Sequence, residues 1–283
     1  MKIYQEKLVG VFGDPVDENP TIVIMQSGFE HLKLPMRYVS VTVKDGDLEA
    51  AMQGMRAMNF TGIGITMPHK QKVLQYLDEV EENAAIMGAV NFVYWKDGKL
   101  RGENTDGQGF MLSLKKGGVD VSGKKAVVLG AGGVARAITV ELANAGVKHI
   151  TVVNIVEEQG RDLVKTLNEK TPAQAEFVLW DHTYQLPADT DILVNGTSIG
   201  FANGNDCPNI DFATVKPNMI VCDVIPNKET TRFLDNAKAI GCRTFNGLGM
   251  LVNQSLRCFE VWTGVEAPVE VMEKALKAEF GIE

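Results

Sequence analysis

Three short segments of the chain carry residues that together could oxidise an alcohol. The segment GIGITMPHK at 62–70 ends in Lys70, and the segment RGENTDG at 101–107 contains Asp106. Such a pair could share one substrate hydroxyl, because the lysine could accept the hydroxyl proton while the aspartate fixes the geometry. The third segment, VVLGAGGVARA at 127–137, has the form of a turn that holds a nucleotide phosphate. We therefore predict a site for hydride transfer between an alcohol and a nicotinamide.

The third segment matches the pattern G-x-G-x-x-G/A at Gly130, Gly132 and Ala135. A strand-like run precedes it and a helical run follows, which is the context that this motif requires. The first glycine permits a tight turn, the second admits the pyrophosphate, and the alanine allows close packing of helix on strand. We predict that backbone amides at the start of this helix bind the phosphates. The predicted phosphate-binding residues are Gly130, Ala131, Gly132, Gly133 and Val134.

The end of the next strand should decide between the two nicotinamide cofactors. An acidic residue there accepts the ribose hydroxyls of NAD, whereas an arginine pairs with the 2′-phosphate of NADP. This chain has Asn154 and Ile155 at that point, followed by Glu157 and Glu158 and by no immediate cation. We predict contacts from Asn154 and Ile155 and a preference for NAD over NADP. NADP could still be preferred if Arg161 folded back.

The composition is that of an ordinary globular enzyme with two domains. The chain has 283 residues, of which 45% are hydrophobic and 23% charged, and its net charge is −8. This charge does not favour nucleic acid or an anionic membrane as a partner. The sequence begins with no apolar run of signal-peptide length, and no metal-ligand spacing occurs among its cysteines. We predict a cytoplasmic protein, without a metal, that binds a small hydroxylated molecule.

Strands and helices alternate along the chain, which indicates an α/β fold. Helices are expected at 20–31, 69–78 and 157–168, and a βαβ unit starts at Lys124. We predict two domains, an N-terminal α/β substrate domain and a Rossmann domain that binds NAD(P). The substrate domain would comprise residues 1–104 and 241–283, and the Rossmann domain residues 105–240.

In addition, the chain resembles the shikimate/quinate dehydrogenase family over nearly its full length. The resemblance rests on GITMPHK, GAVNFV, GENTDGQGF, GAGGVARA, LVNGTSIG and GLGMLVNQSLRCFEVWTG, in the order and spacing of that family. It implies that Lys70 and Asp106 are the catalytic and substrate-orienting pair. It also implies that Thr66, Asn91 and Gln254 bind the substrate. Thr197, Ser198, Gly249 and Met250 would lie against the nicotinamide and its ribose, although Met250 could equally be core filler.

Three departures from the family pattern lie on the substrate side. The family's S-x-S-P segment, whose hydroxyls bind the substrate carboxylate, reads here as Val16 to Pro20, with Asp17 and Asn19 at the serine positions. No tyrosine follows Asp223, and the family's Q-G-A reads Gln254, Ser255, Leu256. A carboxylate at position 17 would repel a substrate carboxylate. We therefore expect a different hydroxylated substrate, unless Lys33 or Arg37 supplies the anion contact.

Other readings of the sequence stay open at this point. A related two-domain folate dehydrogenase also places a lysine before a Rossmann unit, although the N-T-D-G and W-T-G segments favour the first family. A nucleotide-binding sensor without catalysis would need neither Lys70 nor Asp106. His69 is an alternative base, expected to be exposed at a helix start. The chain could be a monomer or a homodimer.

Overall fold

The computed structural model describes residues 5–282 and divides them into two compact units. The first unit contains the described residues up to Thr105 and those from Gln254 onward, and the second contains Asp106–Asn253. The second boundary between the units therefore falls within helix α8, Gly247–Thr263. The boundary predicted from the sequence is near residue 241. Residues 1–4 and 283 of the predicted substrate domain lie outside the described residues. No helix in the described part of the chain is long and apolar enough to cross a membrane.

The first unit is built on a mixed sheet with the strand order β2-β1-β3-β5-β6-β4. Strand β1 runs parallel to β2 and β3, while β5 runs antiparallel to both β3 and β6. Its elements are β1 Lys7–Gly13, α1 Thr21–His31, β2 Met36–Thr42, η1 Asp45–Asp47, α2 Leu48–Ala57, β3 Gly62–Ile65, η2 Lys72–Tyr76, β4 Glu79–Val80, α3 Glu82–Met87, β5 Phe92–Lys96, β6 Lys99–Glu103 and α9 Val269–Glu279.

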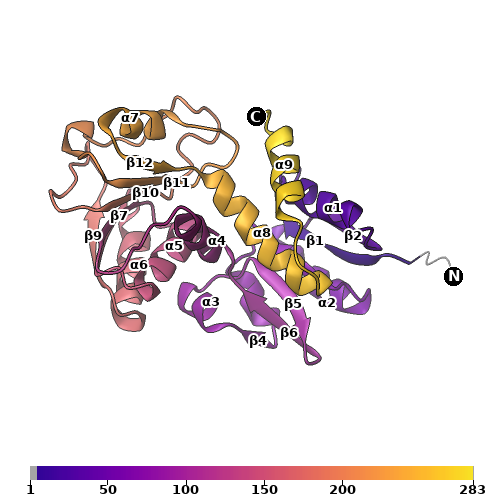
Figure 1. Cartoon of the computed structure of the whole chain (residues 1–283). Helices are drawn as coiled ribbons and strands as arrows, with labels where there is room; N and C mark the ends of the chain where they lie inside the picture. The colour runs from indigo at the N-terminus through magenta and orange to yellow at the C-terminus, as the bar shows by residue number, and fades with distance from the viewer. Residues whose placement is uncertain (1–4, 283) are drawn as a thin grey trace. The chain divides into compact units, whose positions relative to one another are not determined.

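The C-terminal residues complete the core of this first unit. Phe259 on α8 stacks on Phe29 of α1 with ring centroids 5.3 Å apart. A side chain at Gly28 would meet the Phe259 ring at 2.7 Å, so the two helices approach closely only because this residue is glycine. The indole Nε1 of Trp262 donates to the Val93 carbonyl of β5 at 3.2 Å. Figure 1 shows α9 lying beside α1 in the same unit.

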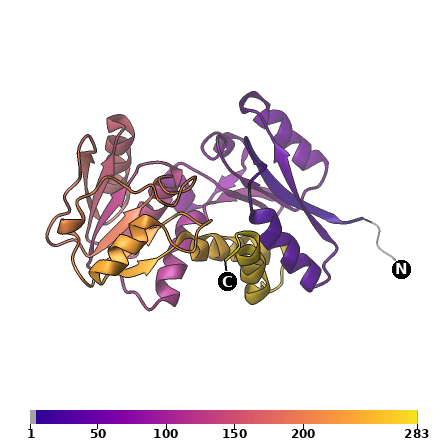
Figure 2. The same cartoon turned by 90° about the horizontal axis from the view of Figure 1, so that it is seen from above.

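The second unit is a fully parallel sheet with the strand order β12-β11-β10-β7-β8-β9. Helix α7 lies on one face of this sheet, and α5 and α6 lie on the other (Figures 1 and 2). The two-domain α/β fold predicted from the sequence is confirmed. The elements are α4 Asp106–Lys116, β7 Lys125–Leu129, α5 Gly133–Asn144, β8 His149–Asn154, α6 Glu157–Lys170, β9 Gln174–Leu179, β10 Ile192–Asn195, η3 Phe212–Thr214, β11 Ile220–Asp223, α7 Arg232–Ile240 and β12 Arg243–Phe245.

Each sheet has a point at which the strand order reverses. In the first unit the chain passes from β1 to β2 on one side, and β3 lies on the other side of β1. In the second unit β8 and β10 flank β7 in the same way. In open α/β sheets, ligands bind outside the carboxyl ends of the strands at such a point. Ligands are therefore expected at the loops after β1, β3, β7 and β10.

One local prediction differs from the structure, and one element was not predicted. The helix expected at 69–78 is only the short 3₁₀ turn η2, because the Lys70 carbonyl accepts from the Val90 amide at 2.8 Å. That carbonyl would otherwise accept the next helical hydrogen bond. In addition, β5 and β6 form an antiparallel hairpin around Asp97 and Gly98, which both have positive φ. The dipeptide Asp-Gly is typical of such a turn.

Candidate active site

The glycine turn of the second unit lies at the strand reversal between β7 and β10. Gly130 follows β7 with φ +103°, a conformation that L side chains rarely adopt. A Cβ there would lie 3.0 Å from the Thr197 methyl and 3.2 Å from the Gly196 carbonyl oxygen. The loop after β10 therefore packs directly on this turn, and the structure brings together Gly130 and Thr197, both predicted from the sequence to contact the nucleotide.

The start of α5 has open space where the phosphates are expected. The helix begins at Gly133 with Gly132 as its N-cap residue, and no side chain caps it. A Cβ built at either glycine meets no atom within 4 Å. The unpaired amides of a helix N-terminus attract an anion, so the turn fits a pyrophosphate. Ala135 is fully buried, and a Cβ at Gly196 would come within 2.9 Å of its methyl, which explains the small residues at both positions.

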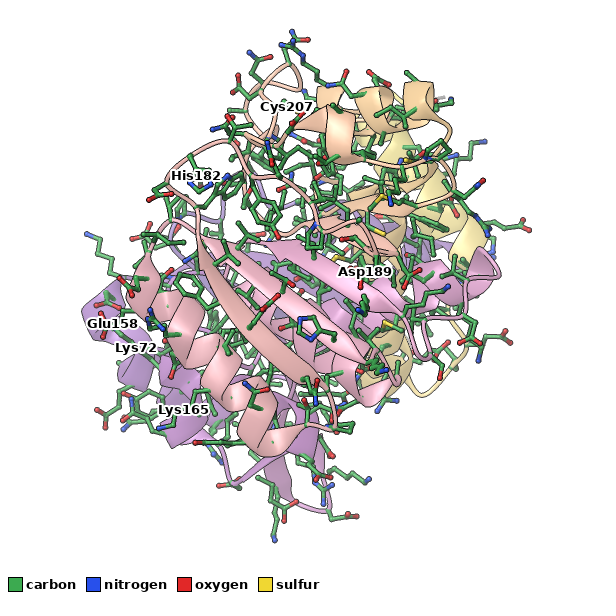
Figure 3. All side chains as sticks on the ribbon, turned by 90° about the vertical axis from the view of Figure 1, so that its left-hand side faces the viewer. Lys72, Glu158, Lys165, His182, Asp189 and Cys207 are labelled. Atoms are coloured by element: carbon green, nitrogen blue, oxygen red, sulfur yellow. The ribbon has the colours of Figure 1, made fainter. Side chains whose placement is uncertain are left out.

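The end of β8 presents no free cation among the side chains the structure describes there. Asn154 is buried, and its Nδ2 donates to the Val156 carbonyl at 2.9 Å, which shapes this turn. Ile155 is 71% exposed. The guanidinium of Arg161 pairs with Glu157 at 2.7 Å and lies over the Phe177 ring, so Arg161 is engaged away from Ile155. Glu158 is exposed on the first turn of α6 (Figure 3).

The loop after β10 is fixed by hydrogen bonds from the buried amide of Asn195. Its Oδ1 accepts from the hydroxyl of Thr197 at 2.6 Å and from the amide of Thr197 at 3.2 Å. Ser198, next in this loop, is exposed. In the first turn of α8, a Cβ at Gly249 would lie 3.0 Å from Ser113 Oγ, and Met250 is only 7% exposed. The low exposure of Met250 agrees with the alternative interpretation that this residue packs in the core.

Asp223 ends the neighbouring strand β11 and is a buried carboxylate. Its Oδ1 accepts from Asn195 Nδ2 at 3.0 Å, and its Oδ2 accepts from Thr231 Oγ1 at 2.6 Å. Burial raises the pKa of Asp223 to about 6, although the hydrogen bonds from Thr231, Ile225 and Asn195 act in the opposite direction. The sequence singled out this residue only for the tyrosine that does not follow it.

In the first unit, the predicted substrate-binding amides lie side by side. Asn91 Nδ2 donates to Gln254 Oε1 at 3.3 Å and to Thr105 Oγ1 at 3.1 Å. The Thr105 amide donates to Asn91 Oδ1 at 2.8 Å, so the orientation of the Asn91 amide group is fixed. Thr105 was missed by the sequence reasoning, although it lies inside the NTDG segment. The structure thus brings together Asn91 and Gln254, which are 163 residues apart in the chain.

Lys70 and Thr66 belong to the loop that follows β3. The Thr66 amide donates to the Phe12 carbonyl at 2.9 Å, and the Lys70 carbonyl accepts from Val90, the residue before Asn91. These bonds hold the Lys70 segment between the end of β1 and the start of β5. Lys70 and Thr66 are both half-buried. The backbone therefore places Lys70 at the same edge of the sheet as the substrate-binding amides.

His69 is not exposed, contrary to the expectation from its sequence context. It is fully buried, and its Nε2 lies 2.6 Å from the Val43 carbonyl oxygen, to which it must donate. The Val43 amide in turn donates to the Gly13 carbonyl at 2.9 Å. His69 therefore ties the loop of Lys70 to the end of β2, and its burial argues against a role as the base.

Asp106 is the first residue of α4 and is 4% exposed. It follows Thr105, the residue held by the Asn91 amide, so its backbone position is set by the segment that Asn91 orders. A carboxylate in the first turn of a helix interacts favourably with the helix dipole.

The loop after β1 carries the substituted serine positions. Asp17 is exposed and Asn19 half-buried, whereas Val16 between β1 and α1 is buried. Asn19 Oδ1 accepts from the Thr21 amide at 3.0 Å at the start of α1. The Asp14 amide donates to the Met67 carbonyl at 2.9 Å, so this loop runs beside the segment of Thr66 and Lys70.

Lys33 and Arg37, the two cations considered as replacements for the serines, do not lie near the loop after β1. Arg37 is the second residue of β2, near its amino end, and pairs with Glu6 at 3.0 Å. Parallel strands β1 and β2 place Arg37 beside Leu8, at the opposite end of β1 from Asp14. Lys33 precedes β2 and is exposed, so it too lies toward the amino end.

The fold and the glycine turn define a two-domain oxidoreductase of the NAD(P)-dependent class. Residues 11–93 match the shikimate dehydrogenase substrate binding domain, and residues 112–200 match the shikimate/quinate 5-dehydrogenase family. Residues 247–277 match the shikimate 5′-dehydrogenase C-terminal domain. The chain belongs to the shikimate/quinate 5-dehydrogenase family, which confirms the resemblance seen in the sequence.

Full-length relatives carry different names within this family. A shikimate dehydrogenase (NADP(+)) of Desulforamulus reducens is 38% identical over 95% of this chain and 94% of that protein. The crystal structure of the ligand-free 5-ketofructose reductase of Gluconobacter sp. strain CHM43 is 43% identical, with a TM-score of 0.92 over 98% of this chain and 99% of that one. Shikimate 5-dehydrogenase from Listeria monocytogenes, in complex with shikimate and NAD, is 33% identical, with a TM-score of 0.89 over 96% of each chain.

The glycine turn can be tested by adding one methyl group. Gly130→Ala combines a strained left-handed residue with a close contact to Thr197, so we expect the dissociation constant of NADH to rise about tenfold or more. Fluorescence titration with NADH measures this change, and thermal unfolding reports the loss of stability.

A matched control is Gly123→Ala, because Gly123 also has positive φ (+72°) but no atom within 4 Å of a Cβ. This control should lower the melting temperature and leave NADH affinity within about twofold of the parent value. If both variants weaken NADH equally, the turn at Gly130 is not the nucleotide site.

Proposed function

We propose that this chain reversibly reduces a ketone of a polyhydroxylated substrate that lacks the carboxylate of shikimate. The observation that carries the proposal is the negative charge of the loop after β1. This loop presents carboxylates at Asp14, Asp17 and Glu18, all exposed, and runs beside the Lys70 segment. Two like charges at about 4 Å repel by ~1 kcal/mol in water and by more in a partly closed site. A substrate carboxylate is therefore disfavoured here.

The comparisons support the same substrate class. The solved protein of 43% identity is called a 5-ketofructose reductase, and the shikimate complex is 33% identical. A polyhydroxy ketone needs several hydrogen-bonding groups and no anion clamp. Amides suit this task because they donate and accept at once. Gln254 uses its Oε1 to accept from Asn91, which leaves its Nε2 group to donate to a substrate hydroxyl.

The catalytic roles follow from the chemistry of the side chains. The nicotinamide cofactor supplies the hydride for reduction and accepts it in the reverse reaction. In the direction of oxidation Lys70 takes the proton of the substrate hydroxyl, and in reduction it returns the proton to the carbonyl oxygen. Asp106 holds the same oxygen and the lysine ammonium in place. Thr66, Asn91 and Gln254 bind the remaining hydroxyls.

We also propose NAD as the preferred nicotinamide cofactor. The support is that no cation among residues 5–282 is placed at Ile155, and that Glu157 engages Arg161. Because both glutamates of this turn are exposed, the preference rests on the missing cation and not on repulsion by Glu157 or Glu158. A cytoplasmic location and a monomeric or dimeric state stay predictions.

The substrate proposal is tested by comparing kcat/KM for 5-ketofructose, 3-dehydroshikimate, shikimate and quinate, each with NAD or NADP in the matching redox state. We expect the neutral ketone to be the best substrate. The relatives named shikimate dehydrogenase favour the other outcome, and a preference for 3-dehydroshikimate would overturn the proposal.

The loop itself is tested by the double substitution Asp17→Ser and Asn19→Ser. Removal of one carboxylate and addition of two hydroxyls should raise kcat/KM for shikimate about tenfold, which corresponds to ~1.4 kcal/mol. Glu30→Ser on α1 removes a carboxylate elsewhere in the same unit and should leave this value unchanged. A gain in the control equal to that in the double variant would count against a local effect.

Lys70→Met should lower kcat by a factor of about 10²–10⁴, the usual contribution of a general acid or base, with little change in NADH affinity. The matched control is Lys72→Met, because Lys72 lies two residues away, is exposed and pairs with Asp45. Steady-state kinetics and NADH titration distinguish the two variants. Turnover of Lys70→Met close to that of Lys72→Met would show that Lys70 is not the base.

Ile155→Arg should shift the cofactor preference toward NADP. A charge-assisted bond contributes about 1.5–3 kcal/mol, so kcat/KM for NADP should rise about tenfold or more. Met58→Arg is the control, because Met58 is also an exposed apolar residue (61%) but lies after α2 in the first unit. The ratio of kcat/KM for NADP to that for NAD is the measured quantity. An unchanged ratio in Ile155→Arg would place the 2′-phosphate elsewhere.

A further inference from the structure

Asp223 is a buried charge without an obvious purpose in the proposed reaction. It is 3% exposed, and no lysine or arginine among the described residues forms an ion pair with it. An uncompensated buried charge is costly, and hydrogen bonds to the carboxylate must offset that cost. The partners of its two oxygens therefore show what the charge holds in place.

The first set of partners leads to the loop after β10. Asn195 Nδ2 donates to Asp223 Oδ1, so the amide oxygen of Asn195 must face the other way, toward Thr197. Asn195 Nδ2 also donates to the Ile199 carbonyl at 3.1 Å. An amide group is nearly symmetric in shape, and only its partners decide which end is oxygen. Without the carboxylate, Asn195 Nδ2 would lose one of its two acceptors, and only the Ile199 carbonyl would remain to hold it.

The second set of partners leads to the start of α8. The Ile225 amide donates to Asp223 Oδ1 at 3.3 Å. The Ile225 carbonyl in turn accepts from the Gly247 amide, the first residue of α8, at 3.2 Å. A Cβ at Gly247 would lie 2.3 Å from the Val224 carbonyl oxygen, so this turn and the helix start are in direct contact. Gly249 and Met250 follow in the same helical turn.

We propose that Asp223 is a positioning residue for the nicotinamide half of the cofactor. One carboxylate oxygen orients both segments proposed to contact that half, the loop of Thr197 and Ser198 and the first turn of α8. This inference rests on the proposed cofactor function and adds a residue that does not itself touch the cofactor. A buried, fully hydrogen-bonded network of this kind fixes a single geometry.

A purely structural role for Asp223 would act through α7. Thr231 is the N-cap of that helix, accepts from the Leu234 amide at 3.4 Å and donates to Asp223 Oδ2. Loss of this contact alone would lower stability without favouring one half of the cofactor over the other. The two roles are therefore separable by ligands that contain or lack the nicotinamide.

The experiment compares NADH and ADP-ribose binding to Asp223→Ala and Asp223→Asn by titration calorimetry. In Asp223→Ala the affinity for NADH should fall about tenfold, the effect of one lost hydrogen bond to a charged group, while that for ADP-ribose changes less than about twofold. Asp223→Asn should restore most of the loss, because its Oδ1 can still accept from Asn195 and Ile225. Asn195→Ala should reproduce the selective loss of NADH affinity. This variant replaces Asp223→Ala in the comparison if Asp223→Ala does not fold.

Hydrogen exchange supplies a readout that needs no cofactor. Amides of Thr197, Ile199 and Gly247 should exchange faster in Asp223→Ala than in the parent chain. The control is Asp211→Asn, whose carboxylate accepts from the Ala213 amide at 3.0 Å at the start of η3 in the same unit. This control should leave both ligands and these amides unchanged.

The outcomes separate this inference from the cofactor proposal. Equal losses of NADH and ADP-ribose affinity in Asp223→Ala, or unchanged exchange at the two segments, would overturn the positioning role. If the parent chain binds neither ligand, the cofactor proposal fails. The exchange experiment then still decides whether Asp223 holds the two segments.

Discussion

The carboxyl ends of parallel strands meet at one edge of a sheet, and in both units neighbouring loops there come almost into contact. At the end of β1, a Cβ on Gly13 would lie 2.2 Å from the Thr66 methyl. At the end of β7, a Cβ on Gly130 would lie 3.0 Å from the Thr197 methyl. In each unit a glycine thus faces a threonine across the strand reversal. The segments proposed to bind substrate and cofactor depend on these two close approaches, because any larger residue would separate the loops.

Much of this arrangement could be predicted from the sequence, because the relevant signals are local. The glycine pattern at 130–135 lies between an apolar strand and a helix, so its motif and its context agree. The fold class could also be predicted, because it follows from the alternating strand and helix patterns. The hairpin of β5 and β6 was not predicted although its Asp-Gly signal was present, because the alternation of strands and helices directed attention to crossover connections.

The rest depends on contacts between residues far apart in the chain, and no local pattern reports them. The sequence around His69 suggests an exposed residue at a helix start, but the Val43 carbonyl binds and buries it. Likewise, nothing near Asp223 indicates that Asn195 and Thr231 share its two oxygens. In both units an asparagine side chain at the end or start of a strand is oriented by such distant partners: Asn195 by Asp223, and Asn91 by Thr105. The chemistry of the site was thus easier to predict than the groups that orient it.

The division of α8 between the two units bears on how the chain is made. The second unit, which contains the glycine turn, is contiguous and complete at Asn253. The first unit consists of an N-terminal part and the residues from Gln254 onward. Because synthesis proceeds from the N-terminus, the second unit can fold while the first unit still lacks Phe259 and Trp262. During that interval the surface of Phe29 and the backbone of Val93 have not yet received the partners that cover them. The first unit is therefore begun before the second unit on the ribosome and is completed after it.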